Sequence, residues 1–401
     1  MAALPPSSQL DQDNGDKQTH TVRRSAMKSL ETYRSYFPVV QRKIWLNHSA
    51  LGILSTRVTD AIRNGLDCFS SGETSIETQL RELAAARTAA AAFIGADPEE
   101  VAFTKNVADG LSIVANGLNW RKGDKVIVAD QEFPANVFPW LNLEKWGVEV
   151  FKIGSRDGRI LLQSVLEAID ERTRIVSLSW VEFGTGYRNN LRAIADACHA
   201  KDALFCVDAI QGLGALPLDV RKTDIDMMAT SSHKWLLGPL GVGWLYVRRN
   251  LIGKIGVSVV GQTSVQRQIS TDYLDYTLPL WPDARRFEPG VQNHLGLIGL
   301  HAALGLLNEI GIDHIRDRIK YLTDRIVIGL IERGYHVVSS RVDEEWSGAV
   351  CFVSSQVPVS NIYASLLAKD VVTSLRGNVI RVSPHFYNND EDIARFLTAL
   401  P

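Results

Sequence analysis

The sequence predicts an α/β protein with a mostly parallel sheet flanked by helices, followed by a smaller α+β unit. Two observations predict this class. From about residue 43 onward, short apolar runs alternate with amphipathic helical patterns, as expected for strands joined through helices on both faces of a sheet. After about residue 285 the alternation gives way to a long helical stretch and two further apolar segments.

Each expected element has its own pattern. Buried strands are predicted from apolar runs at 126–129, 175–178, 203–207, 225–230 and 243–247. Helical periodicity predicts helices over 75–95, 106–117, 161–171 and 190–201. The C-terminal pattern predicts a helix over 291–333, apolar segments near 335–340 and 348–355, and a final helix near 390–400. Ligands of such sheets bind at the carboxyl ends of the strands, so functional residues are expected there.

The pattern also divides the chain into segments. Residues 1–24 are polar, lack aromatic side chains and contain no apolar core of a secretory signal, so we expect a disordered tail. A mitochondrial presequence is disfavoured by the acidic residues of this stretch. We expect residues 25–44 to pack on the smaller domain, residues 45–284 to form the large domain, and residues 285–401 to form the small one.

Composition excludes several classes of protein. The 43 Lys and Arg residues nearly balance 45 Asp and Glu residues, so the chain lacks the basic excess of a nucleic-acid-binding protein. The four cysteines form no CxxC pair or disulfide framework, which favours a reducing cytoplasm. No apolar run approaches the roughly 20 residues of a membrane span, and no metal site is expected. A cytoplasmic α/β enzyme without nucleic-acid or membrane partners is predicted.

The segment 225–245, IDMMATSSHKWLLGPLGVGWL, is the most informative. An apolar strand runs into Ser231, Ser232, His233 and Lys234, and a glycine-containing turn follows. A lysine at the mouth of a buried strand is prone to desolvation, which lowers the pKa of its amine and makes the amine nucleophilic. Such lysines form Schiff bases with carbonyl cofactors. For a lone His-Lys pair, a surface lysine in a loop is the alternative.

A second strand end carries a complementary charge. Asp208 follows the apolar run at 203–207, and Gln211 comes three residues later. A buried carboxylate needs a cationic partner, and the ring nitrogen of pyridoxal phosphate is one that an aspartate commonly holds. An aspartate after a strand is otherwise often a cap or turn residue.

Together these segments resemble the class V aminotransferase family of pyridoxal-phosphate enzymes, roughly from Ile44 to the end of the chain. The family includes cysteine desulfurases, kynureninases, isopenicillin N epimerase-like proteins and cysteine C–S lyases. The resemblance implies pyridoxal-phosphate fold type I, with a large domain on a mostly parallel mixed sheet and a smaller α+β domain. It implies that Lys234 holds pyridoxal 5′-phosphate as a Schiff base, that Asp208 pairs with the pyridine nitrogen, and that Gln211 contacts the phenolic oxygen.

The phosphate ligands implied by the resemblance come from two places. Ser231 and His233 match the phosphate ligands that precede the family's lysine. The segment 103–110, FTKNVADG, resembles the phosphate loop that opens a helix, where free N–H groups favour an anion. The usual hydroxyl residues are replaced by Val107 and Ala108, so backbone contacts are expected there, with Asn106 as a further candidate.

The resemblance also assigns residues around the ring and the substrate. Phe133 takes the stacking position that a histidine holds in desulfurases, which a π-face can fill. Arg381 matches the arginine that clamps the substrate α-carboxylate through a bidentate fork, and Arg376 adds a second contact or selects the side chain. Asn47 and His48 are candidates for substrate contact, with a structural histidine as the alternative for His48.

The segment 286–293, RFEPGVQN, resembles the part of the family that reaches into a neighbouring subunit's phosphate site, with Gln292 as the candidate ligand. The resemblance therefore implies a homodimer with shared active sites.

Several reactions of an amino acid at Cα remain open. Residues 371–380 contain no cysteine, and Cys351 lies in an apolar run, which disfavours a persulfide-forming desulfurase. The first expectation is β-elimination from a cysteine conjugate, by a C–S lyase of specialised biosynthesis. The alternatives are an aminotransferase, an epimerase, and oxidative deamination linked to decarboxylation. From another class, a non-catalytic binding protein on the same fold is the further alternative.

Overall fold

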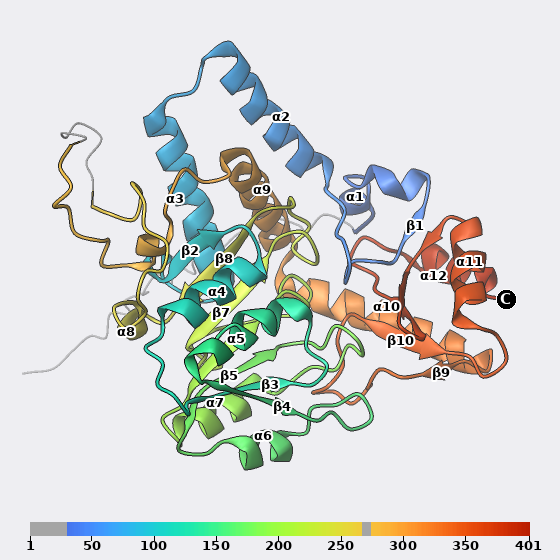
Figure 1. Cartoon of the computed structure of the whole chain (residues 1–401). Coiled ribbons are helices and arrows are strands. Elements are labelled where there is room, and N and C mark those ends of the chain that lie inside the picture. The colour runs from blue at the N-terminus through green and yellow to red at the C-terminus, as the bar shows by residue number, and fades with distance from the viewer. Residues whose placement is uncertain (1–29, 267–273) are drawn as a thin grey trace, which may run out of the picture.

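The computed structural model describes residues 30–266 and 274–401. The expected tail over residues 1–24 lies outside the described residues, as do residues 25–29 of the expected N-terminal segment. Figure 1 shows one large layered body, with a smaller sheet and its helices beside it near the C-terminus.

The larger sheet has seven strands in the order β2-β8-β7-β6-β5-β3-β4. They are β2 (Val101–Thr104), β3 (Lys125–Ala129), β4 (Glu149–Ile153), β5 (Thr173–Ser179), β6 (Leu204–Asp208), β7 (Met227–Ser231) and β8 (Gly243–Val247). Only β8 runs antiparallel to its neighbours, while the pairs from β7 to β4 are parallel. The predicted fold class is confirmed, and β2 and β4 are additions to the predicted strands.

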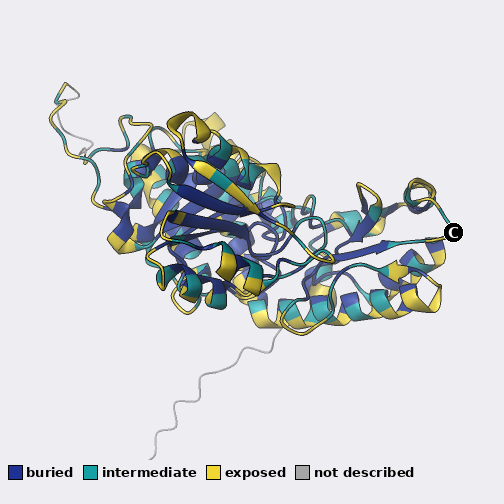
Figure 2. Ribbon diagram, turned by 60° about the horizontal axis from the view of Figure 1, so that its bottom comes forward, coloured by how far each residue is buried: buried dark blue, intermediate teal, exposed yellow. Residues whose placement is uncertain are grey.

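Helices cover both faces of this sheet, because side chains alternate along each strand. On β6, Phe205 and Val207 join the core beneath one face, and Cys206 joins the core beneath the other. The first core contains side chains of α3 (Ile76–Phe93), α6 (Leu162–Ala168), α7 (Leu191–His199) and α9 (His294–Ile310). The second contains side chains of α4 (Val107–Gly117), α5 (Phe138–Leu141) and α8 (Arg249–Ile252). Figure 2 shows the buried strands between helices whose outer faces are exposed.

The second sheet has the order β12-β13-β10-β9 and is antiparallel throughout. Its strands are β9 (His336–Val337), β10 (Val350–Val353), β12 (Ser374–Arg376) and β13 (Val379–Val382). The helices around it are α10 (Ile312–Glu332), α11 (Val359–Ala368) and α12 (Asp390–Ala399). Their apolar side chains form a core separate from the two cores of the larger sheet.

The helix expected over 291–333 is two helices, α9 and α10, which meet at an angle of 78°. They break at Gly311, whose φ of 87° lies in the left-handed region that favours glycine. α9 packs on α2 (Thr56–Ser71) and α3, whereas α10 packs on α12 and β9. The main packing partners of the two helices therefore differ, although Ile315 and Ile319 of α10 still join the first core of the larger sheet. Within the described residues, no single helix is long and apolar enough to cross a membrane.

The N-terminal residues are joined to the second sheet's unit by backbone and side-chain bonds. After α1 (Leu30–Arg34), strand β1 (Ile44–Trp45) pairs in parallel with β11 (Val371–Val372). Arg34 forms an ion pair with Asp392, with 2.8 Å between Nη1 and Oδ2. The ring of Phe37 stacks on that of Tyr387, with 3.9 Å between the centroids. Residues 30–45 therefore contact the C-terminal unit, and Tyr33 also contacts the larger unit through Glu309 of α9.

We expect Leu111→Ala to destabilise the fold, because Leu111 on α4 is fully buried against the sheet. Removing a buried leucine side chain typically lowers the free energy of unfolding by about 2–5 kcal/mol. Urea unfolding followed by circular dichroism measures the change. Leu166→Ala on α6 is the matched control, since that side chain is 42% exposed. Equal unfolding curves for the two variants would show that α4 does not pack as described.

Candidate active site

A cavity of about 380 Å³ opens where β6 and β7 end and α4 begins. Its volume lies within the range of small-molecule sites. The lining residues come from both sheets and from the loop after β1: Ser49, Ala50, Asn106, Val107, Ala108, Phe133, Ala135, Phe183, Asp208, Ile210, Gln211, Ser231, His233, Lys234, Arg376 and Arg381. Eleven of the fourteen site residues predicted from the sequence are in this set; Asn47, His48 and Gln292 are not.

Lys234 lies in the turn that follows β7 and is 8% exposed. Burial lowers the pKa of its amine to about 8; Asp208 opposes this shift, and Arg381 and Arg376 add to it. The Lys234 amine lies 5.4 Å from the ring centroid of Phe133. A lysine with this pKa has a substantial neutral fraction near neutral pH, which is what a nucleophile or a general base requires.

The backbone around Lys234 is held tightly. The N–H of Leu237 donates to the Lys234 carbonyl at 3.1 Å, and Leu237 has a φ of 55°, which is strained for a leucine. The loop after β1 lies against the same turn, because the N–H of Gly52 donates to the His233 carbonyl at 2.7 Å. A Cβ at Gly52 would lie 2.1 Å from the Lys234 carbonyl oxygen, so only glycine fits there. The turn therefore positions the lysine before any ligand binds.

Asp208 ends β6 and is 1% exposed. Its Oδ1 accepts from the N–H of Ile210 at 3.0 Å. Burial raises the pKa of Asp208 to about 6, against the opposing effects of the Ile210 N–H and the Lys234 charge. A cationic ring nitrogen in the cavity would stabilise this carboxylate in its ionised form.

Gln211 has a fixed side-chain amide. Its Nε2 donates to the Ser49 carbonyl at 3.0 Å, and its Oε1 accepts from Trp235 Nε1 at 3.3 Å. The orientation of the amide therefore depends on the loop after β1 and on the residue that follows Lys234.

The start of α4 forms the end of the cavity that suits an anion. Asn106 caps the helix by accepting from the Asp109 N–H at 3.0 Å, and Val107 and Ala108 form its first turn. The Val107 N–H donates to Ser231 Oγ at 3.0 Å, which leaves the Ser231 hydroxyl proton available for a ligand. Burial and the charge of Lys234 lower the pKa of His233 to about 4, so this ring is a neutral donor or acceptor at pH 7. Helix N–H groups and such side chains together bind phosphate.

Two phenylalanine rings form a wall of the cavity. Phe133 is 43% exposed, and its ring meets Phe183 edge to face with 5.3 Å between the centroids. An exposed aromatic ring at a cavity is ready to stack on a planar ligand. Phe183 was not predicted; its position after β5, beside the predicted strand ends, is the signal in the sequence that could have identified it.

Arg381 lies on β13 and is 1% exposed. Its Nη1 donates to the Phe183 carbonyl at 2.5 Å, while its Nε is buried without a partner in the described part of the chain. Burial lowers the pKa of Arg381 to about 10. A buried guanidinium without a carboxylate partner is costly, so this residue points to an anionic ligand.

His48 does not line the cavity, and of the two roles considered for it the structure agrees with the structural histidine. It is fully buried, and its ring nitrogens are bonded to the Ser383 carbonyl and the Tyr387 hydroxyl, each at 2.9 Å. Asn47 lies outside the lining too, and its side-chain oxygen accepts from the Ser374 hydroxyl. The neighbouring Ser49 and Ala50 line the cavity instead. Gln292 lines a second cavity.

A pair of buried carboxyl groups near the site was missed in the sequence. Glu132 accepts from the Ser179 N–H at 2.5 Å and from the Ser179 hydroxyl at 2.6 Å. One oxygen of Glu182 accepts from Asn189 Nδ2 at 2.8 Å, and the other is buried without a partner among the described residues. Burial is the main cause that raises the pKa of each. Both residues follow strand ends, but only the folded structure shows that they are buried.

The arrangement fits pyridoxal phosphate. The cavity brings together a desolvated lysine, a buried carboxylate, an exposed aromatic ring and a helix N-terminus. Lys234 can form the covalent bond, Asp208 can hold the ring nitrogen, and Ser231, His233 and the first turn of α4 can hold the phosphate. The partnerless Nε of Arg381 is left for a second anion.

The chain resembles known proteins over most of its length. A family model described as aminotransferase class-V matches residues 68–396. The "uncharacterized aminotransferase YcbU" of Bacillus subtilis (strain 168) is 31% identical over 363 residues, which cover 90% of this chain and 95% of that protein.

Solved structures share the fold. The apo structure of cysteine desulfurase from Thermococcus onnurineus NA1 superposes with a TM-score of 0.84 at 24% identity, covering 93% of this chain and 97% of that one. The cystine C–S lyase C-DES in complex with its reaction product cysteine persulfide superposes with a TM-score of 0.83 at 25% identity, covering 90% of this chain and 98% of that one.

We expect cofactor-free protein to form a Schiff base with added pyridoxal phosphate at a rate that rises with pH and levels off above about 8. Only the neutral amine reacts, and the pKa of Lys234 is about 8 instead of the ordinary 10.5. Stopped-flow absorbance measures the rate. Lys234→Ala should abolish the adduct trapped by borohydride, whereas Lys222→Ala on the surface should keep it. A rate that keeps rising towards pH 10 would contradict a desolvated Lys234.

Proposed function

We propose a reaction for this chain on the premise that the chain belongs to the class-V aminotransferase family. It is therefore a pyridoxal-phosphate-dependent enzyme that acts on amino acids. When bound, pyridoxal phosphate supplies an aldehyde for Schiff-base chemistry and a ring that withdraws electrons from Cα of the substrate.

Lys234 is proposed as both the attachment residue and the group that removes the proton from Cα. Its pKa of about 8 gives the released amine the basicity that a general base needs near neutral pH. Asp208 holds the ring nitrogen in its cationic form, because burial raises the pKa of its carboxyl group despite the charge of Lys234, and a further cation stabilises the ionised form. Phe133 stacks on the ring and excludes water from that face.

Arg381 is proposed to orient the substrate through its α-carboxylate. The contact with the Phe183 carbonyl fixes the guanidinium of Arg381. The Nε of Arg381 has no partner among the described residues and can donate to a substrate carboxylate. A guanidinium binds a carboxylate through two parallel hydrogen bonds, which limits rotation of the substrate. This orientation decides which bond to Cα faces Lys234.

We propose β-elimination from a cysteine conjugate as the reaction. In this reaction the Cα proton moves to Lys234, the C–S bond breaks, and the sulfur leaves with the electron pair. Conjugate and water then give pyruvate, ammonia and a thiol. We choose this reaction over persulfide formation because no cysteine is among the described residues that line the cavity. Cys351 is fully buried on β10, its Sγ contacts the Gly184 carbonyl at 3.3 Å, and burial raises the pKa of its thiol to about 11.

The structural relatives are named for two activities, and these differ in whether they need a cysteine of the protein. A desulfurase passes sulfur to a cysteine of the protein, while C–S lysis needs only a base and an electron-withdrawing cofactor. The structure of the cystine C–S lyase C-DES covers 90% of this chain. Transamination is the second candidate, because the Bacillus subtilis relative is named an aminotransferase.

Product analysis tests the reaction. Incubation with S-substituted cysteines should release pyruvate and free thiol, detected by mass spectrometry. Cys351→Ser and Cys68→Ser should retain this turnover, because neither thiol takes part, while Lys234→Ala should lose it. A keto acid with an intact side chain would replace the proposal with transamination. Deuterium exchange at Cα without product would indicate an epimerase, and release of CO2 would indicate decarboxylation.

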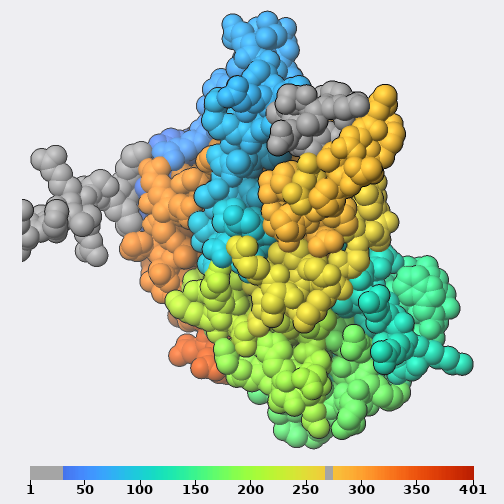
Figure 3. All heavy atoms as spheres, turned by 90° about the vertical axis from the view of Figure 1, so that its left-hand side faces the viewer, coloured from blue at the N-terminus to red at the C-terminus, as the bar shows by residue number. Residues whose placement is uncertain are grey.

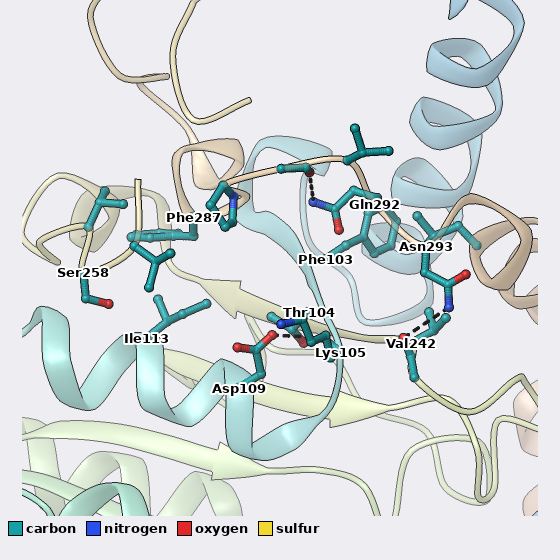
Figure 4. A pocket seen from close by; sticks show the side chains of 17 residues that line it. Phe103, Thr104, Lys105, Asp109, Ile113, Val242, Ser258, Phe287, Gln292 and Asn293 are labelled. Atoms are coloured by element: carbon teal, nitrogen blue, oxygen red, sulfur yellow. Dashed lines mark hydrogen bonds between the residues drawn. The ribbon is translucent and has the colours of Figure 1, made fainter. Parts of the chain in front are cut away.

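We also propose a homodimer in which Gln292 serves the neighbouring protomer. Gln292 is absent from the cavity that holds Lys234 and lines a second cavity of about 570 Å³. Figure 4 shows Gln292 and Asn293 on one side of this cavity, and Thr104, Lys105 and Asp109 on another. The amide of Gln292 bonds to the Gly290 carbonyl at 3.0 Å, which shapes the segment around Val291.

The surface beside the second cavity favours an apolar partner. Val291 is 85% exposed, and Leu240, Val259 and Val260 are exposed as well. Figure 3 shows residues from about 250 to 266 and from 274 to about 290 on the face that also carries α2 and α3. Contiguous exposed apolar side chains are typical of protein interfaces. A second copy of the chain would cover them.

We expect the protein to sediment as a dimer in analytical ultracentrifugation, and we expect Val291→Asp to shift it towards the monomer. The aspartate would bring an unpaired charge into an apolar interface. Gln292→Ala should weaken binding of pyridoxal phosphate although Gln292 does not line the Lys234 cavity of its own protomer. Ile331→Asp, on the exposed face of α10, is the control that should leave the dimer intact. A monomeric wild type with full cofactor binding would refute the shared site.

A further inference from the structure

Arg376 and Arg381 project from the same face of one hairpin. Strands β12 and β13 pair so that Ser374 lies opposite Arg381, and Arg376 lies opposite Val379. Arg376 is two residues from Ser374, so its side chain is on the same face as that of Arg381. Residues in this diagonal relation are roughly 7–8 Å apart at the backbone, within reach of long side chains. Both side chains line the cavity of Lys234.

The charges that line the cavity do not balance. The lining contains three cationic side chains, Lys234, Arg376 and Arg381, against the single carboxylate of Asp208. Neither arginine makes an ion pair with a carboxylate in residues 30–266 or 274–401. The positive charge of Arg376 also acts on the two other cations, because it lowers the pKa of Lys234 and that of Arg381.

The proposed function accounts for one arginine only. Arg381 takes the α-carboxylate, and the start of α4 with Ser231 and His233 takes the phosphate, on the large sheet. Arg376 has no assigned partner, although its guanidinium is at the cavity. Unlike the buried Arg381, it lies at the exposed rim of the cavity. A group at the far end of a substrate side chain would reach this rim.

We infer that the substrate carries a second anionic group at the end of its side chain, a carboxylate or sulfonate, which Arg376 binds while Arg381 holds the α-carboxylate. This inference rests on the proposed function and narrows it to amino acids with an acidic side chain. The stem of such a side chain passes Phe133 and Phe183, whose rings suit a short apolar linker. Arg376 therefore selects substrates by the charge of the terminal group and not by the shape of the side chain that carries it.

The test uses matched ligand pairs with the enzyme in its cofactor-bound form. S-carboxymethyl-L-cysteine is compared with its neutral amide, S-carbamoylmethyl-L-cysteine, and L-glutamate with L-glutamine. Dissociation constants come from titrating the visible absorption band of the cofactor. In the wild type, we expect the acid of at least one pair to bind at least about tenfold more tightly, as is typical of a charge-assisted hydrogen bond. In Arg376→Gln, that ratio should fall to near one.

The ratio within one variant is insensitive to partial loss of cofactor or of folded protein, so a damaged variant cannot imitate the result. Arg325→Gln, at an exposed position on α10, should keep the wild-type ratio. Equal binding of acid and amide in the wild type would overturn the inference and leave the proposed function intact. So would an unchanged ratio in Arg376→Gln. If no ligand of either pair perturbs the band, the proposed function itself fails.

Discussion

The site depends on charges that are buried before any ligand arrives. Lys234, Asp208 and Arg381 are all nearly inaccessible to water, and burial is the largest cause of the pKa shift of each. A folded chain keeps such groups only where the surrounding structure is rigid and a ligand supplies the missing partner. The parallel strands supply the rigidity, because Asp208 and Lys234 follow neighbouring strands whose ends are fixed by two helical layers.

The site also depends on two separate cores. The large sheet provides the lysine, the carboxylate and the helix N-terminus, whereas the small antiparallel sheet provides both arginines. The groups proposed to hold the cofactor are therefore on one unit, and those proposed to hold the substrate's acid groups are on the other. The hairpin β12–β13 also acts on the lysine, because the charges of Arg381 and Arg376 lower the pKa of Lys234.

Sequence reasoning found the residues whose position follows from strand ends or from a family motif. Lys234, Asp208 and Arg381 follow or occupy apolar runs that could be recognised without a structure. The sequence left two roles open for His48, because its partners Ser383 and Tyr387 are more than 300 residues away in the sequence. Glu182 and Phe183 were missed for a related reason: their burial or exposure is decided by contacts between elements. The break at Gly311 could not be seen either, since apolar periodicity continues on both sides of it.

The loop after β1 connects the small unit to the turn that carries Lys234. Leu46 exchanges backbone bonds with Val372 and Ser383 of the small unit, and a few residues later Gly52 bonds to the carbonyl of His233. This short stretch is therefore bonded at one end to the unit that carries Arg376 and Arg381, and at the other end to the turn that carries Lys234. A rotation of the small unit on the large one would therefore displace the turn that carries Lys234, because residues 46–52 are bonded to both.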